Sequence, residues 1–208
     1  MNLFRQNRTF SRYTAIVILS VLTLVFIGFA LIRSPTLIIP PTDPANPTTV
    51  YVIDYGYHSR LILPDRQGGL LQYTYGDWHY FALNQQDLSD GLAALLMPTS
   101  GTLGRKRAND ITELQQELGS DWQDTLLSFE VAGTQAAQLL ESLNERFNQN
   151  IDTRIVNPRN NVAFVQDDQD YTVFHNSNHE LVNWLEELDC QVEGFVTWPN
   201  FQVKHSEN

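Results

Sequence analysis

A long apolar segment near the N-terminus restricts this chain to the proteins that enter or cross a membrane. From Thr14 to Ile32 the sequence reads TAIVILSVLTLVFIGFALI, and all nineteen residues are apolar or small and uncharged. A helix of this length crosses the hydrocarbon core of a bilayer, which is about 30 Å thick. Three arginines and no acidic residue precede the segment, so the positive-inside rule keeps residues 1–13 in the cytoplasm. We therefore predict a transmembrane helix over residues 14–32 that anchors the chain in the cell inner (plasma) membrane.

A cleaved signal peptide is the alternative interpretation of this segment. Signal peptides have an apolar region of about 7–15 residues followed by a small-x-small cleavage site. The run in this chain is longer, and it ends in FALIRS, residues 29–34, without such a site. These features favour an uncleaved anchor, and both interpretations put the remaining residues outside the cytoplasm.

A proline-rich stretch separates the apolar segment from the rest of the chain. Five prolines lie between Pro35 and Pro47, a composition typical of an extended, semi-rigid spacer. We therefore predict a linker over residues 33–47 and one extracytoplasmic domain over residues 48–208. A domain of this length can bury a full hydrophobic core.

The part of the chain beyond the apolar segment is strongly acidic. All 24 Asp and Glu residues follow Arg33, together with only nine of the 13 Lys and Arg residues. Such a surface repels polyanions, which excludes nucleic acid as a partner. Cys190 is the only cysteine, so the domain is held together by its core and not by an internal disulfide.

Hydrophobic patterns in residues 48–208 alternate between those of strands and those of helices. Stretches rich in β-branched and aromatic residues predict strands, and apolar residues at helical spacing predict helices. The predicted strands are a pair flanking residue 56, then 71–83, 101–107, 125–131, 162–165, 171–174 and the closing GFVTWPNFQV, with an acidic turn at 167–170. The predicted helices cover 85–97, 134–148 and about 177–188. This mixture predicts an α+β domain with a mainly antiparallel sheet.

The last predicted helix opens with a polar cluster in the segment FHNSNHELVNWL, residues 174–185. Ser177 begins an i, i+4, i+7 pattern that continues with Leu181 and Trp184, so it lies at the start of the inward face. Two interpretations fit this position. Ser177 and Glu180 match a capping box, in which both side chains accept hydrogen bonds from backbone N–H groups. Ser177 also stands where a nucleophile is placed, because the amides of a helix N-terminus stabilise an oxyanion.

Three segments of the chain resemble the motifs of one bacterial family of unknown function. GYHSRLILP (56–64) is similar to its GWHTGIVLP segment, YTYGDWHYF (73–81) to its GWGD..FY segment, and NSNHELVNWL (176–185) to its TCNTWTA..L helix. The third segment also resembles the NCEHFV..L helix of lecithin:retinol acyltransferase-like proteins. Both groups resemble circularly permuted NlpC-type papain-like domains, in which the strand with the catalytic His precedes the helix with the Cys. The resemblance covers most of residues 50–195 and implies a permuted papain-like fold.

The resemblance also implies roles for individual residues. His58 matches the base, Ser177 matches the nucleophilic Cys, and Asp77 is the candidate for the group that orients the His. The sequence departs from the family in two motifs, because its HTG triplet is His58-Ser59-Arg60 here and its Cys is Ser177. A thiol can be held as a thiolate at a helix N-terminus, whereas a serine hydroxyl must lose its proton during the attack.

The loss of sulfur favours a non-catalytic domain that binds an envelope peptide, lipid or protein. The alternative is a serine-dependent hydrolase or transacylase that acts on amide, peptide or acyl bonds of envelope components. His175 and His179 have the spacing of a zinc pair on a helix, but the Glu of HExxH is missing and His175 precedes the expected cap. We therefore expect no metal and no cofactor, and a bilayer contact through residues 14–32.

Overall fold

The computed structural model describes residues 13–14, 16–24, 26, 28, 35–55, 58–85, 97–197 and 200–204. The chain divides into two compact units, Met1–Ser34 and Pro35–Asn208. The described residues between positions 13 and 28 are helical. Among all described residues, no helix has the length and hydropathy needed to cross a membrane. Positions 15, 25, 27 and 29–32 of the predicted transmembrane segment lie outside the described residues.

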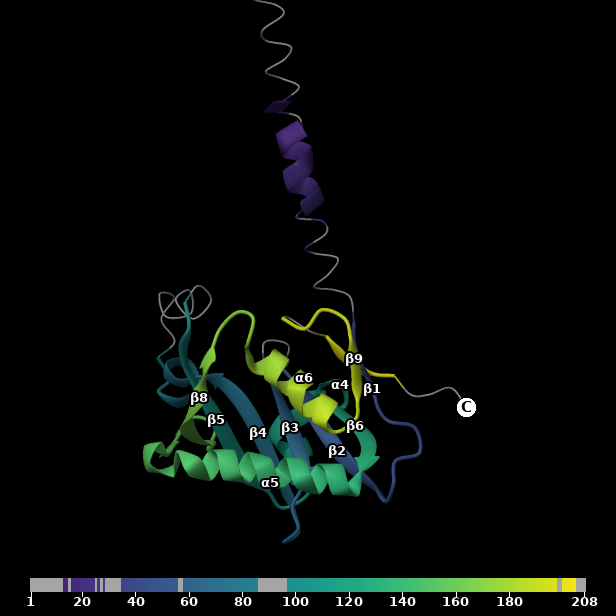
Figure 1. The fold of residues 1–208 in the computed structure, drawn as a ribbon, viewed down its shortest axis with the longest axis vertical. Coiled ribbons are helices and arrows are strands. Elements are labelled where there is room, and N and C mark those ends of the chain that lie inside the picture. The colour runs from purple at the N-terminus through teal and green to yellow at the C-terminus, as the bar shows by residue number, and fades with distance from the viewer. Residues whose placement is uncertain are drawn as a thin grey trace, which may run out of the picture. The chain divides into compact units, whose positions relative to one another are not determined.

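A seven-stranded antiparallel sheet forms the centre of the second unit (Figure 1). Its strand order is β6-β2-β3-β4-β5-β8-β7, and each neighbouring pair is antiparallel. The strands are β2 (Pro47–Asp54), β3 (Ser59–Pro64), β4 (Leu70–Asp77), β5 (Thr99–Ala108), β6 (Leu126–Ala132), β7 (Ile155–Val156) and β8 (Ala163–Tyr171). A smaller sheet has the order β10-β1-β9, formed by β1 (Thr36–Ile39), β9 (Gln191–Glu193) and β10 (Phe201–Val203). The predicted α+β class with a mainly antiparallel sheet is confirmed.

Helices cover both faces of the large sheet. On one face, α5 (Gly133–Gln149) and α6 (Ser177–Glu187) lie across the strands (Figure 1). They share a core with Leu61 and Leu63 of β3, whereas the intervening Ile62 packs on the other face with α3 (Ile111–Leu118). This division follows from the alternation of side chains along a strand. The remaining short helices are the π-helix η1 (Trp78–Ala82), η2 (Gly119–Asp121), α4 (Trp122–Thr125) and η3 (Ile151–Thr153).

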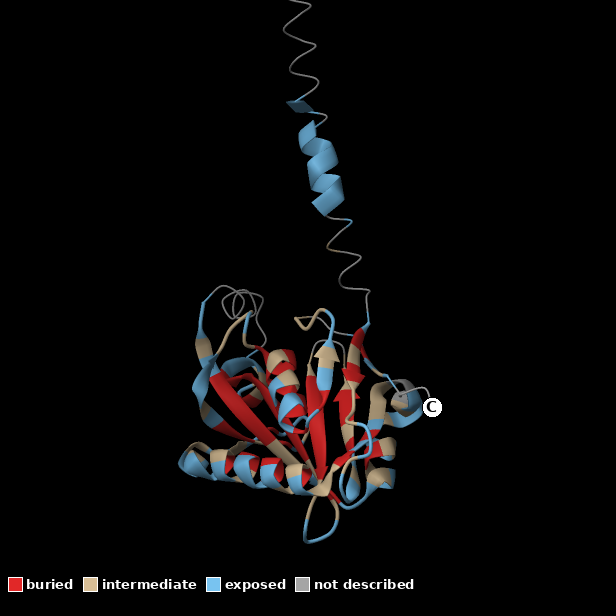
Figure 2. Ribbon diagram, turned by 45° about the vertical axis from the view of Figure 1, so that its right-hand side comes forward, coloured by how far each residue is buried: buried red, intermediate tan, exposed pale blue. Residues whose placement is uncertain are grey.

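Helix α5 illustrates how the hydrophobic pattern positions an element. Its inward residues Ala136, Leu139, Leu140, Leu143 and Phe147 are buried, and Figure 2 shows exposed turns on its outer side and buried strands beneath it. The helix predicted over 134–148 is therefore confirmed, as are the strands predicted at 101–107 and 125–131. Residues 86–96 of the helix predicted over 85–97 lie outside the described residues.

The proline-rich segment is not only a spacer. Leu37, Ile38 and Ile39 interrupt its prolines with three apolar residues, and they form most of strand β1. Strand β1 pairs in parallel with β10 and antiparallel with β9, and Ile38 is fully buried. The prediction that the folded domain begins at residue 48 was therefore wrong, because the apolar triplet joins the core of the second unit.

The acidic stretch 167–170 also differs from its prediction as a turn. It continues strand β8 from Ala163 to Tyr171. Arg146 of α5 donates to both carboxylate oxygens of Asp167, at 2.7 and 2.9 Å. This ion pair compensates the negative charge of Asp167, so the acidic stretch can form a strand. The strand predicted at 171–174 was wrong, because Thr172 and His175 form a tight turn in which Thr172 Oγ1 accepts hydrogen bonds from the amides of Phe174 and His175.

Candidate functional site

The first turn of α6 is capped by Asn176 and not by Ser177. Asn176 Oδ1 accepts hydrogen bonds from the amides of Asn178 and His179, at 3.0 and 3.2 Å. An Asn at this position satisfies the first free amides of a helix, as a Ser would. Ser177 is the next residue along, 1% exposed, and its Oγ has no hydrogen-bond partner in the described part of the chain. The predicted capping box at Ser177 was therefore wrong by one residue.

Glu180, the other member of the predicted capping box, belongs to a buried charge network. Its carboxylate pairs with Arg146, which also holds Asp167, and it lies 3.4 Å from His175 Nε2. The side chains of Asp167 and Glu180 are each 3% exposed. Burial and the Asp167 charge raise the pKa of the neighbouring Tyr75 hydroxyl. This network fixes α5, α6 and β8 to one another.

His58 lies on the face of the large sheet opposite α6. The adjacent Ser59 donates through Oγ to Asn178 Oδ1 of α6 at 3.2 Å, so Ser59 faces that helix. The His58 ring instead stacks on Tyr55, with 4.8 Å between centroids, and contacts Phe81 at 5.2 Å. Successive side chains of an extended segment point to opposite faces. Burial, with a contribution from Arg60, lowers the pKa of His58 to about 4, so the imidazole is neutral at pH 7.

Asp77 ends strand β4 and caps the π-helix η1. Its Oδ1 accepts a hydrogen bond from the amide of Tyr80 at 2.7 Å. Among the described residues, no hydrogen bond or ion pair joins any two of His58, Asp77 and Ser177. The structure therefore does not assemble these three residues into a catalytic triad, because the phase of β3 directs His58 away from the helix that carries Ser177.

His58 instead lines a pocket of about 420 Å³. The pocket has aromatic walls formed by Tyr55, Tyr80, Phe81 and Phe164. Its other lining residues are polar: Thr74, the amides Asn84, Asn157 and Asn160, and the cations Arg60 and Arg159.

The wall formed by η1 is fixed to the loop that precedes β8. Asn157 is 2% exposed, and its Nδ2 donates to the carbonyl of Phe81 at 2.6 Å and to Asn84 Oδ1 at 3.0 Å. Asn157 Oδ1 accepts a hydrogen bond from the amide of Arg159 at 2.9 Å. The pocket is therefore formed by backbone and side-chain hydrogen bonds that do not depend on a ligand.

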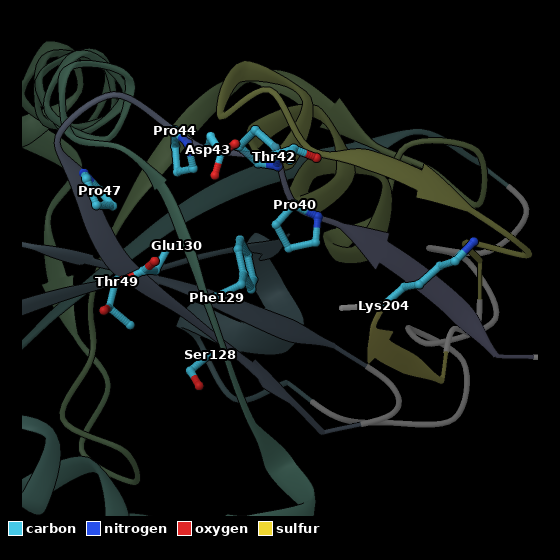
Figure 3. A pocket seen from close by; sticks show the side chains of 11 residues that line it. Pro40, Thr42, Asp43, Pro44, Pro47, Thr49, Ser128, Phe129, Glu130 and Lys204 are labelled. Atoms are coloured by element: carbon cyan, nitrogen blue, oxygen red, sulfur yellow. The ribbon is translucent and has the colours of Figure 1, made fainter. Parts of the chain in front are cut away.

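A larger pocket of about 680 Å³ lies between the loop at residues 40–47 and strand β6 (Figure 3). Its charged lining residues have both signs: Asp43, Glu130 and Lys204. Figure 3 shows the Lys204 side chain extending away from the other lining residues. None of the buried polar atoms that lack a partner among the described residues belongs to this lining. The pocket therefore offers little to select a ligand.

The sequence pointed to His58 and to the aromatic residues around its motif, of which Tyr55 and Tyr80 line the pocket, but it did not indicate the other lining residues. Arg60 stands where the bacterial family that this chain resembles in its motifs has the glycine of HTG. Residues 157–164 also contribute to the pocket lining, but no motif in the sequence indicated this. No protein-family model matches this chain, and no match was found among curated proteins or among solved structures.

Proposed function

We propose that this protein is a non-catalytic ligand-binding domain, held on the outer face of a membrane by its N-terminal apolar segment. The observation that carries the proposal is the orientation of His58, which faces a preformed pocket and not Ser177. A pocket of about 420 Å³ is within the size range of small-molecule sites, which is about 300–1,000 Å³.

The geometry gives no support to the serine-hydrolase alternative. A serine nucleophile needs a base within hydrogen-bonding distance of its hydroxyl, about 3 Å, or one bridging water. Ser177 is almost fully buried, and its Oγ lacks a partner among the described residues. We further propose that the domain descends from a permuted papain-like enzyme. The support for this descent is that the polar start of α6 packs against the strand that begins at Ser59.

Chemical labelling tests the non-catalytic assignment. The full chain in detergent micelles is treated with a serine-reactive phosphonate probe, alongside an active serine hydrolase as a positive control. We expect no labelling of wild-type protein and no alkylation by iodoacetamide at position 177 of the Ser177→Cys variant, because that site is buried and no base among the described residues bonds to its hydroxyl. Labelling that is abolished by both Ser177→Ala and His58→Ala would show that the domain is an enzyme.

Membrane attachment is tested separately by cell fractionation. Full-length protein is expected in the membrane fraction and to resist extraction with carbonate. A variant that starts at Pro35 and carries a cleavable export signal is expected in the soluble extracytoplasmic fraction. If both forms fractionate alike, residues 1–34 are not the anchor.

A further inference from the structure

The pocket beside His58 has a charge opposite to that of the protein. The chain carries a net charge of −11, yet Arg60 and Arg159 line this pocket, and no carboxylate occurs among the described residues of its lining. A cleft lined by one sign of charge attracts ligands of the opposite sign. The electrostatics of the pocket therefore favour an anion.

Arg60 is built into the pocket with part of its hydrogen-bonding capacity unused. The residue is 6% exposed, and its Nη1 donates to Gln72 Oε1 at 3.0 Å and lies 3.5 Å from Glu117 Oε1. The buried Nε has no hydrogen-bond partner within the described part of the chain. A buried guanidinium N–H without an acceptor is unfavourable, so the protein compensates this cation only in part.

Glu117 divides its carboxylate between Arg60 and Lys106, and its contact with Lys106 is the shorter of the two. Its Oε2 lies 2.8 Å from Lys106 Nζ. Burial is the largest influence on the pKa of this carboxyl and raises it, but Lys106, Arg60 and Gln72 together outweigh burial and lower the pKa. The Arg60 guanidinium lies over the Tyr55 ring, 5.3 Å from its centroid. This stacking fixes the cation beside the aromatic wall.

We propose that this pocket binds a small organic carboxylate, whose acid group pairs with Arg60 and whose apolar body lies against Tyr55 and Phe81. The inference rests on the proposed function and names the ligand class of the same site. The two oxygens of a carboxylate match the paired N–H groups of a guanidinium. The single negative charge of a carboxylate also equals the positive charge of Arg60, the buried cation of the described lining. A phosphate monoester, with a charge of about −1.5 to −2 at pH 7, would need the exposed Arg159 in addition to Arg60 to compensate its charge.

Three probes that share a phenyl ring test this inference on the full chain in detergent micelles. Phenylacetate, phenylacetamide and phenyl phosphate are titrated while the imidazole resonance of His58, assigned with a His58→Gln variant, is followed by NMR. We expect phenylacetate to shift this resonance and to bind at least roughly tenfold more tightly than the amide, as the loss of a charge-assisted hydrogen bond implies.

A pair of charge-matched variants locates the effect. Arg60→Gln is expected to weaken phenylacetate binding by roughly tenfold or more. Arg66→Gln removes the same charge from an exposed surface pair with Glu141, outside the pocket, and is expected to leave binding unchanged. The comparison of acid with amide uses wild-type protein, so it stands even if Arg60→Gln fails to fold.

The outcomes separate this inference from the proposed function. Equal affinity for acid and amide, tighter binding of phenyl phosphate, or unchanged binding by folded Arg60→Gln would overturn the carboxylate assignment. A shift of the His58 resonance by neutral probes alone would also overturn it but would retain the pocket as a ligand site. If no member of a broader fragment set moves the His58 resonance, the proposed ligand-binding function fails as well.

Discussion

His58 and Ser59 are neighbours in the chain, yet their side chains lie on opposite faces of the seven-stranded sheet. Ser59 Oγ donates to Asn178 on α6, whereas His58 stacks on Tyr55 in the pocket on the other side. Motif comparison pairs His58, as the base, with Ser177, as the nucleophile. Ser177 begins helix α6, so the two residues belong to separate environments on opposite faces of the sheet. Each environment can be tested independently of the other.

Substitutions at the start of α6 test which residue caps the helix. Ser177→Ala removes a buried hydroxyl without a partner among the described residues, so we expect the free energy of unfolding to stay constant or to rise by up to about 1 kcal/mol. Asn176→Ala removes the acceptor of two helix amides and should lower it by about 1 kcal/mol. Urea denaturation measures both values, and a larger loss at Ser177 would restore the capping box.

The half-buried imidazole of His58 should make the fold sensitive to acid. Its pKa is about 4 in the folded chain and about 6.5 in an unfolded one. Between these values the unfolded state binds the additional proton, so stability falls as the pH drops from 7 to 4. The loss attributable to His58 is about 3 kcal/mol.

Denaturation of wild-type and His58→Gln protein at a series of pH values measures this contribution. The variant is expected to lose less stability than the wild type between pH 6.5 and pH 4. Parallel pH profiles of the two proteins would show that His58 is not buried as a neutral group.

Arg146 should be the most sensitive charged residue of the domain. Arg146→Met leaves the carboxylates of Asp167 and Glu180 buried without their cation, a change that costs about 3–5 kcal/mol. Arg66→Met is the control, since the pair of Arg66 with Glu141 is exposed and such pairs contribute about 0–1 kcal/mol. Equal losses in the two variants would contradict the network described at α6.

Cys190 should be chemically inert in the folded protein. It is 4% exposed, and burial raises the pKa of its thiol to about 12. Because the thiolate is the reactive form, we expect no alkylation by iodoacetamide at pH 8 until denaturant is added. Mass spectrometry of the alkylated chain gives the result, and rapid modification of the native protein would place Cys190 at the surface.

The sequence predicted the elements of the fold better than their details. The pattern of Leu139, Leu143 and Phe147 repeats at helical spacing, so α5 could be located from local information. The acidic part of β8 could not, because Arg146, the residue that makes a strand tolerable there, lies in a different element. The Leu37–Ile39 triplet was overlooked because its proline neighbours dominate the local composition.

The candidate site was only partly accessible from the sequence. Motif comparison singled out His58 but gave no information on the face of the sheet to which its side chain points. That direction depends on the phase of β3 relative to α6, which the contact from Ser59 to Asn178 and the packing of Leu61 and Leu63 with α6 reveal. The pocket also requires Asn157 to fix the carbonyl of Phe81, a contact between segments that are distant in sequence.

The two outer strands of the large sheet have a consequence for association with other chains. Unpaired strand edges can template pairing between molecules and lead to aggregation. The sheet ends on one side in β7, which is only two residues long. On the other side it ends in β6, whose Glu130 and Ser128 are exposed beside prolines of the 40–47 loop. At the first border β7 pairs with only Ala163 and Phe164 of β8, and the rest of β8 carries the exposed Asp168 and Asp170. Exposed charge at both borders, together with the prolines beside β6, should keep the domain from polymerising through its sheet.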